Sequence, residues 1–172
     1  MTVGAFQAIQ GAVGPGNWPQ ASFGPPGDVT VAGCRRLYYP YDWTLFRCRA
    51  NTWLGATGMN LACLVDCRTG VAATTDPFAT ERVAAGDALV MDRRIDPETA
   101  LRLARRYAAY AIRQKHKALV LPRLEVVERR SVYKPFWVVD TRSKNGRPQT
   151  LLIDGLTGEH CTLPAGSRAD CF

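Results

Sequence analysis

YYPYDW (residues 38–43) and YKPFW (residues 133–137) carry the same phrase, a tyrosine followed two residues later by a proline and then by aromatic residues. Proline has no backbone N–H group, so within a sheet it marks the start of a strand or an edge. Aromatic side chains favour a pleated, half-buried surface and bury a large area against a helix. The phrase therefore predicts two strands that place aromatic side chains on a core.

A second pair of matches lies downstream, LVDCRTG at residues 64–70 and LIDGLTG at residues 152–158. In D-x-x-T-G the Asp and Thr side chains bond to their own turn, and the glycine permits a tight reversal. This turn chemistry explains Asp66 and Asp154 better than a catalytic carboxylate pair does. The spacing from proline to aspartate is 26 residues in the first copy and 19 in the second. We infer a duplicated β-meander unit with a longer hairpin loop in the first copy, around residues 56–60.

A helix is predicted between the two copies. Asp96 is a good N-cap, Pro97 fits the first helical position and Glu98 suits the positive end of the helix dipole. Apolar residues then recur at helical spacing as far as residue 112, which predicts a helix from residue 97 to about residue 117. Its opposite face is basic and consists of Arg102, Arg106, Arg113 and Lys117.

Strand-like runs fill most of the remaining chain, at residues 35–75 and in the last third. We expect an α+β fold of two related antiparallel β-meanders, with the one main helix packed on the sheet. The expected organisation is an extended Gly/Pro-rich segment over residues 1–33, a first meander over residues 34–95, and a helix with a second meander over residues 96–172. Together these parts are expected to form one compact domain.

The order of helix, strand meander, aliphatic pair and D-x-x-T-G-E resembles the PepSY-type domain. It is carried here by residues 97–117, 124–139 and 152–159, and the resemblance covers about half of the chain. Such domains are small α+β units thought to act as inhibitory, regulatory or protein-binding modules, so the resemblance implies a binding role. No catalytic residues come with it.

Charge is unevenly placed along the chain of 172 residues, whose formal net charge is +7. Residues 93–147 hold 15 Lys and Arg against 5 Asp and Glu, a local excess of +10, so the rest of the chain has a net charge of −3. This segment predicts a cationic surface that meets an acidic partner. Residues 1–33 cannot form a core alone, so their aromatic residues Phe6, Trp18 and Phe23 anchor the segment either to its own domain or to a partner.

Cys63 and Cys67 are the most metal-like pair among the six cysteines, because structural zinc accepts a C-x₃-C spacing. On one strand, however, the two sulfurs would lie about 13 Å apart, which is too far to share one ion. The sequence also holds no second clean pair. Buried reduced thiols are the expected state, with a zinc site or a disulfide or redox pair as alternatives.

A catalytic motif is not evident in the sequence. Its two histidines, His116 and His160, belong to no nucleophile motif, and there is no Gly-rich phosphate loop, G-x-S-x-G or dinucleotide fingerprint. We therefore expect no enzyme activity of the chain's own, and leave open an active site built jointly with a larger enzyme. We also expect no cofactor, zinc excepted.

A non-catalytic accessory, regulatory or assembly subunit is the expected function. The predicted partner-binding residues are Phe6, Trp18, Phe23, Arg102, Arg106, Arg113, Arg129 and Arg130. The partner is expected to be an acidic protein or a larger enzyme subunit. The alternative is a nucleic-acid-binding module that uses the basic helix face with nearby aromatic residues.

The location that the sequence predicts is the cytoplasm. Residues 1–20 contain no Lys or Arg and no compact apolar core, which argues against a secretory leader. The chain has no run of 18 apolar residues, so no membrane insertion is expected.

Overall fold

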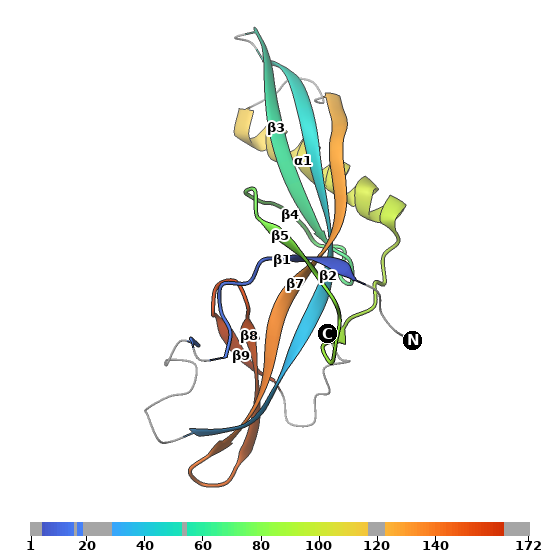
Figure 1. Ribbon diagram of the computed structural model, residues 1–172. Coiled ribbons are helices and arrows are strands. Elements are labelled where there is room, and N and C mark those ends of the chain that lie inside the picture. The colour runs from blue at the N-terminus through green and yellow to red at the C-terminus, as the bar shows by residue number, and fades with distance from the viewer. Residues whose placement is uncertain (1–4, 16, 19–28, 53–54, 117–122, 164–172) are drawn as a thin grey trace. The chain divides into compact units, whose positions relative to one another are not determined.

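The structure, a computed structural model, describes residues 5–15, 17–18, 29–52, 55–116 and 123–163 (Figure 1). These residues form one helix and nine strands. Their bounds are β1 (Phe6–Ile9), β2 (Val29–Thr52), β3 (Gly55–Asp66), β4 (Ala72–Thr74), β5 (Thr80–Val83), β6 (Leu89–Val90), α1 (Pro97–His116), β7 (Arg123–Ser143), β8 (Pro148–Asp154) and β9 (His160–Leu163).

The expected α+β class with two antiparallel meanders is wrong. Strands account for 56% of the structure and helix for only 14%, so the protein is mainly β. Its sheet is mixed, because β1 pairs with β7 and β6 pairs with β2 in parallel, while the other pairs with a known register are antiparallel. The strand order is β4-β3-β2-β7-β1-β5, with β6 beside β2 and with β8 and β9 following β7.

Two compact units share the chain in alternating segments. The first unit holds Met1–Tyr39, Ala79–Met91 and Tyr133–Phe172, and the second holds Pro40–Phe78 and Asp92–Val132. The long strands β2 and β7 each contribute residues to both units. A single long strand therefore cannot be assigned to one meander, which is why the expected pair of meanders fails.

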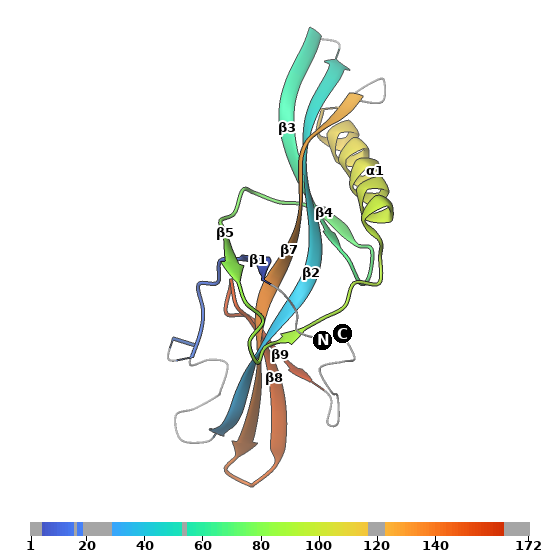
Figure 2. The same ribbon diagram turned by 45° about the vertical axis from the view of Figure 1, so that its right-hand side comes forward.

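The second unit is built on the β2–β3 hairpin, and α1 packs on one face of it (Figure 2). The hairpin ladder has twelve residue pairs and runs from Tyr41–Asp66 to Thr52–Gly55. Residues 56–60, where we expected a loop, therefore belong to β3. The core beneath α1 consists of Phe46, Cys48, Cys63, Val65, Ala100, Ala104, Ala108 and Ile112, all 2% exposed or less.

The first unit contains the β7–β8–β9 meander, with a β7–β8 ladder of seven pairs. One of its core clusters consists of Trp137, Val139, Leu151 and Ile153, and Trp18 packs against this cluster. A second cluster is formed by Leu37, Met91 and Val138. In the part of this unit that the structure describes there is no helix, and Trp18, which lies outside the strands, packs on the first of these clusters.

We expected Pro40 to mark the start of a strand or an edge, but it lies inside β2. Before it, Tyr38 pairs with Val90 of β6; after it, Tyr41 pairs with Asp66 of β3. The proline thus stands where β2 changes its partner, a position at which a missing N–H interrupts neither of these ladders.

Pro135 occupies the matching position in β7. Tyr133 pairs with Ala8 of β1, and Phe136 pairs with Asp154 of β8. The carbonyl groups of Pro40 and Pro135 each accept a hydrogen bond from the second residue of a D-x-x-T-G turn, at 3.1 and 3.0 Å. The repeated phrase therefore marks a change of ladder in both strands.

The two D-x-x-T-G turns have the same hydrogen bonds. Two successive main-chain N–H groups donate to Oδ1 of the aspartate, at 2.8 and 3.0 Å for Asp66 and at 2.8 and 3.3 Å for Asp154. The glycine N–H donates to the aspartate carbonyl at 2.9 Å in both turns. Gly70 and Gly158 adopt φ values of 80° and 76°, in the left-handed region that favours glycine. Both aspartates thus have the turn role that the sequence indicates.

Candidate protein-binding face on helix α1

Helix α1 begins where its sequence predicts. The Thr99 N–H donates to Oδ1 of Asp96 at 2.9 Å, and this bond holds the pKa of the Asp96 carboxyl below its usual value. Ala100, Ala104 and Ala108 are fully buried, and their small side chains bring the helix close to the sheet. The opposite side of the helix is left to solvent.

That solvent side carries a row of basic residues around one tyrosine. Arg102, Arg106, Tyr110 and Arg113 follow one another at spacings of four, four and three residues, so they lie along one face. All four are exposed, and Tyr110 keeps 60% of its surface in solvent. Within the described residues none of the three arginines has a carboxylate partner; Arg102 donates only to the Thr99 hydroxyl, at 3.1 Å.

A shallow pocket of about 360 Å³ opens beside this row, between α1 and the turn that follows β3. Gly70 is part of its wall, and a Cβ atom there would lie 3.4 Å from Cδ1 of Leu103, which lines the same pocket. The pocket is lined by Gly70, Ala72, Leu103, Arg106, Tyr107 and Tyr110. The helix thus offers one mainly apolar pocket with a guanidinium group at its wall.

Arg129, a predicted partner-binding residue, lies in an internal ion cluster. Asp42 is 2% exposed and accepts hydrogen bonds from Arg93 at 2.8 and 2.9 Å and from the Ser131 hydroxyl at 2.8 Å. Arg129 adds a contact to Asp42 at 3.4 Å, another to Glu98 at 3.1 Å, and a hydrogen bond to the carbonyl of the first helical residue. Arg129 thus links β7 to the start of α1.

The pKa of Asp42 is set by two opposing effects. Burial alone would raise it, but hydrogen bonds from Arg93 and Ser131, together with the charges of Arg93 and Arg129, outweigh burial and hold it below its usual value of 3.8. The carboxylate therefore stays ionised near neutral pH and serves as the anionic centre of the cluster.

Arg130 is also engaged internally. Its guanidinium carbon lies 4.5 Å from the centre of the Trp43 ring, and its Nε lies 3.0 Å from Glu128. Of the five arginines that the sequence singles out, Arg102, Arg106 and Arg113 are therefore the ones without an ion-pair or ring partner in the part of the chain that the structure describes.

The N-terminal aromatic residues make ring contacts inside the first unit. The Phe6 ring centre lies 4.9 Å from that of Tyr38 and 4.7 Å from that of Tyr133. The Trp18 ring lies 6.2 Å from Trp137, whose Nε1 donates to the Val13 carbonyl at 2.9 Å. Phe23 is outside the described residues. Phe6 and Trp18 thus hold the segment to its own unit.

Cys63 and Cys67 are both fully buried. Burial raises the pKa of each thiol to about 12, so both thiols are protonated in this state near neutral pH. No group of three or more His, Cys, Asp or Glu side chains in the described part of the chain is placed to hold a metal ion.

Tyr110 is the site residue that sequence reasoning missed. It stands four residues after Arg106 and three before Arg113, so helical spacing alone places it on the basic face. Its type favours burial, and Tyr107, three residues earlier, is half-buried. The spacing was therefore the available signal, and the 60% exposure of Tyr110 confirms that it belongs to the outer face.

Comparisons of the chain with protein-family models, with curated proteins and with solved structures found no match. Among the described residues no helix has the length and apolar character needed to cross a membrane.

Proposed function

We propose that this protein is a non-catalytic accessory or regulatory module that binds an acidic segment of a protein partner on the outer face of α1. The observation that carries the proposal is the row of Arg102, Arg106 and Arg113 around the exposed Tyr110. The expected family relation to PepSY-type modules stays a prediction, and it agrees with a binding role.

The chemistry of this face suits carboxylates combined with one apolar anchor. Arginine binds carboxylates through two parallel N–H···O bonds, and arginine and tyrosine are enriched among the residues that dominate binding energy. The pocket beside Tyr110 accepts an aliphatic or aromatic side chain, while Arg106 at its wall pairs with a neighbouring carboxylate. A partner segment with acidic residues around one apolar residue fits both features.

A protein partner is favoured over nucleic acid for two reasons. The pocket is mainly apolar, which suits a side chain better than a phosphate backbone. Three basic residues that would extend such a surface beyond α1 have partners, since Arg129 and Arg130 contact carboxylates and Lys134 pairs with Asp154. Continuous tracking of a phosphate chain needs several free cations in a row.

An affinity pull-down from extracts of the cells that make the protein tests the proposal, with mass spectrometry of the captured proteins. The unmodified chain should retain a stoichiometric partner. Reversing three charges, by Arg102→Glu, Arg106→Glu and Arg113→Glu, should abolish its capture, and Tyr110→Ala should weaken binding about tenfold, or about 1.4 kcal/mol.

The matched control reverses three exposed arginines elsewhere, by Arg49→Glu, Arg82→Glu and Arg142→Glu, and should keep the partner. Equal loss in both triple variants would reduce the binding to net charge and contradict the proposal. Nuclease-sensitive capture with a high ratio of absorbance at 260 nm to that at 280 nm would favour the nucleic-acid alternative.

A further inference from the structure

Among the described residues, strand β4 has a neighbour on one side only. It stands at the end of the strand order, and β3 is the strand that pairs with it. The Val71 carbonyl accepts a hydrogen bond from β3 at 2.9 Å, and the Thr75 N–H donates one to β3 at 3.1 Å, so the main-chain groups of these two residues face β3. Because main-chain direction alternates along an antiparallel strand, Ala72 and Thr74 direct their N–H and C=O groups away from β3.

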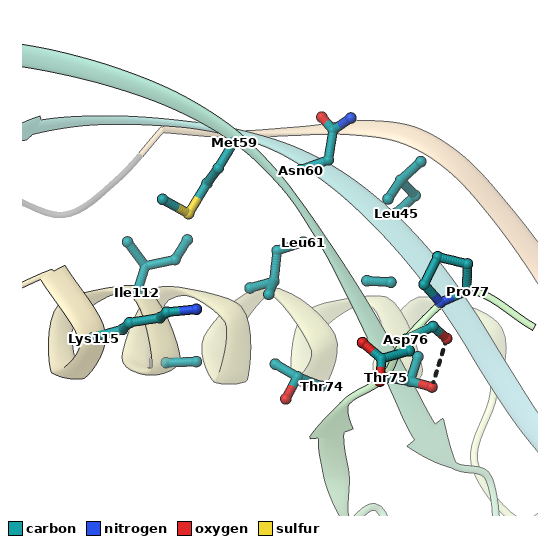
Figure 3. A pocket seen from close by; sticks show the side chains of 12 residues that line it. Leu45, Met59, Asn60, Leu61, Thr74, Thr75, Asp76, Pro77, Ile112 and Lys115 are labelled. Carbon is teal, nitrogen blue, oxygen red and sulfur yellow. Dashed lines mark hydrogen bonds between the residues drawn. The ribbon is translucent and has the colours of Figure 1, made fainter.

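Strand β4 runs alongside α1 in the same direction as the helix. Ala72, at the start of β4, lines the pocket beside α1 together with Leu103 from the first half of the helix. Thr74, at the end of β4, lines a groove of about 630 Å³ with Ile112 and Lys115 from the last turns of the helix (Figure 3). A further strand beside β4 would therefore extend along the flank of α1.

The pocket lies where a further strand would place a side chain. Ala72 packs against the core beneath α1, so its side chain lies on the helix face of the sheet. Residues directly opposite each other on adjacent strands direct their side chains to the same face. The residue opposite Ala72 therefore faces the pocket lined by Leu103, Arg106, Tyr107 and Tyr110. The residues two positions before and after it also face α1.

The part of α1 next to this edge is positively charged. Residues 99–116 of the helix and residues 67–75 of the turn and β4 include no acidic residue. Arg106, Arg113 and Lys115 are exposed and have no ion-pair partner among the described residues. Carboxylates of a bound segment suit these cations, whereas a second copy of this chain would bring two basic flanks together.

We propose that the outer edge of β4 binds an extended segment of the protein partner as an added strand. One apolar side chain of this segment enters the pocket, and an acidic residue lies two positions to each side of it. The inference rests on the proposed function and adds the conformation and sequence pattern of the bound segment. Main-chain hydrogen bonds to Ala72 and Thr74 supply affinity, while the pocket and the cations select the side chains.

A synthetic peptide tests this proposal on the purified full chain. Its seven residues are a central leucine, a glutamate two positions to each side, and threonine elsewhere. Fluorescence anisotropy of the labelled peptide should give a dissociation constant on the order of 100 μM, because the contact is short. The matched control peptide has the same composition, but its leucine and glutamates are consecutive and so alternate between the two faces of a strand. It should bind about tenfold more weakly or worse.

Amide hydrogen exchange measures the main-chain pairing directly. At saturating peptide, exchange of the Ala72 and Thr74 N–H groups should slow about tenfold or more. Thr74→Pro removes one outward N–H and no β3–β4 bond, and should raise the dissociation constant of the peptide about tenfold. Thr74→Val keeps the N–H and should leave the constant unchanged. The exchange measurement and the two peptides do not depend on the proline variant folding.

Peptide binding without slower exchange at Ala72 and Thr74 overturns the added strand. So does equal binding of the two peptides, the absence of binding at millimolar concentration, or an unchanged dissociation constant for the folded Thr74→Pro chain. Exchange at these amides that slows with protein concentration in the absence of peptide assigns the edge to a second copy, and also overturns the proposal.

Failure of the added strand is distinguishable from failure of the proposed function. If reversing Arg102, Arg106 and Arg113 abolishes capture of the partner while the peptide tests fail, the binding face stands and the added strand does not. If that reversal leaves capture unchanged, the proposed function itself fails.

Discussion

At the scale of single residues, Asp42 shows how this protein tolerates a buried charge. Taking a carboxylate out of water costs several kcal/mol unless cations and hydrogen bonds replace the lost solvation. Here Arg93 supplies a bidentate pair, and Ser131 and Arg129 supply two further contacts. The cluster joins β2, β7 and the segment before α1, so this one carboxylate orients three parts of the second unit.

We predict that Asp42→Asn lowers the free energy of unfolding by about 3 kcal/mol, because it removes the anion that Arg93 binds through two oxygens and one of the two carboxylates that Arg129 contacts. Urea unfolding at pH 7 measures this change. Asp140→Asn is the matched control: that carboxylate is 46% exposed and lies 3.9 Å from Arg35, so its removal should cost less than about 1 kcal/mol. Equal losses in the two variants would contradict a special role of Asp42.

The lowered pKa of Asp42 also determines how the difference in unfolding free energy between the unmodified chain and Asp42→Asn depends on pH. As pH falls from 3.8, the unfolded chain takes up a proton at this carboxyl before the folded chain does. The stabilising contribution is therefore complete above the ordinary pKa and is lost as pH falls through the folded pKa. The stability gap between the unmodified chain and Asp42→Asn should be constant from pH 5 to pH 7 and shrink below pH 3.8. A stability difference that grows as the pH falls would contradict this prediction.

At the scale of helices, strands and turns, the sequence predicted the helix cap and the turns correctly. It did not predict where the strands begin and end. The Asp96 cap and the D-x-x-T-G turns depend on bonds within four residues, and the structure has them where the sequence indicates. The course of β2 through Pro40 depends instead on which distant strand lies alongside each half. Residues 56–60 illustrate the same limit, because the longer spacing from proline to aspartate in the first copy suggested a loop there, whereas these residues pair with β2 as part of β3.

We predict that Gly70→Ala destabilises the protein by about 1–2 kcal/mol, because its φ of 80° is unfavourable for a residue with a Cβ atom. The added methyl group would also lie only 3.2 Å from Ile95 Cδ1. Thermal and urea unfolding measure the loss. Gly33→Ala serves as the control, since a Cβ there meets nothing within 4 Å and φ is not in the left-handed region; it should be neutral or slightly stabilising.

At the scale of the whole molecule, sequence reasoning succeeded with the repeated turns and failed with the class of fold. Two matching phrases suggested two separate meanders, each complete in its own half of the chain. The structure instead divides the long strands β2 and β7 between two units. Their residues were evident as strand formers, and the repeated phrase lies where each strand changes its partner. The phrase does not tell which distant strand lies beside each half, because that depends on tertiary pairing.

The last prediction concerns the N-terminal segment. It tests whether the aromatic residues of this segment stabilise their own unit or bind a partner protein. Phe6 lies against Tyr38 and Tyr133, and β1 pairs with β5 and β7. Phe6→Ala should therefore lower the free energy of unfolding by about 2 kcal/mol, less than a fully buried phenylalanine would cost. Hydrogen exchange should show reduced protection in residues 133–139.

Val71→Ala is a suitable control for Phe6→Ala, because Val71 is 67% exposed and its truncation should change stability by less than about 0.5 kcal/mol. Capture of the partner by the folded Phe6→Ala chain should persist, since the proposed binding face lies on α1. If instead the variant keeps its stability and its hydrogen-exchange protection but loses the partner, the aromatic segment binds the partner directly, and the binding face extends beyond Arg102, Arg106 and Arg113.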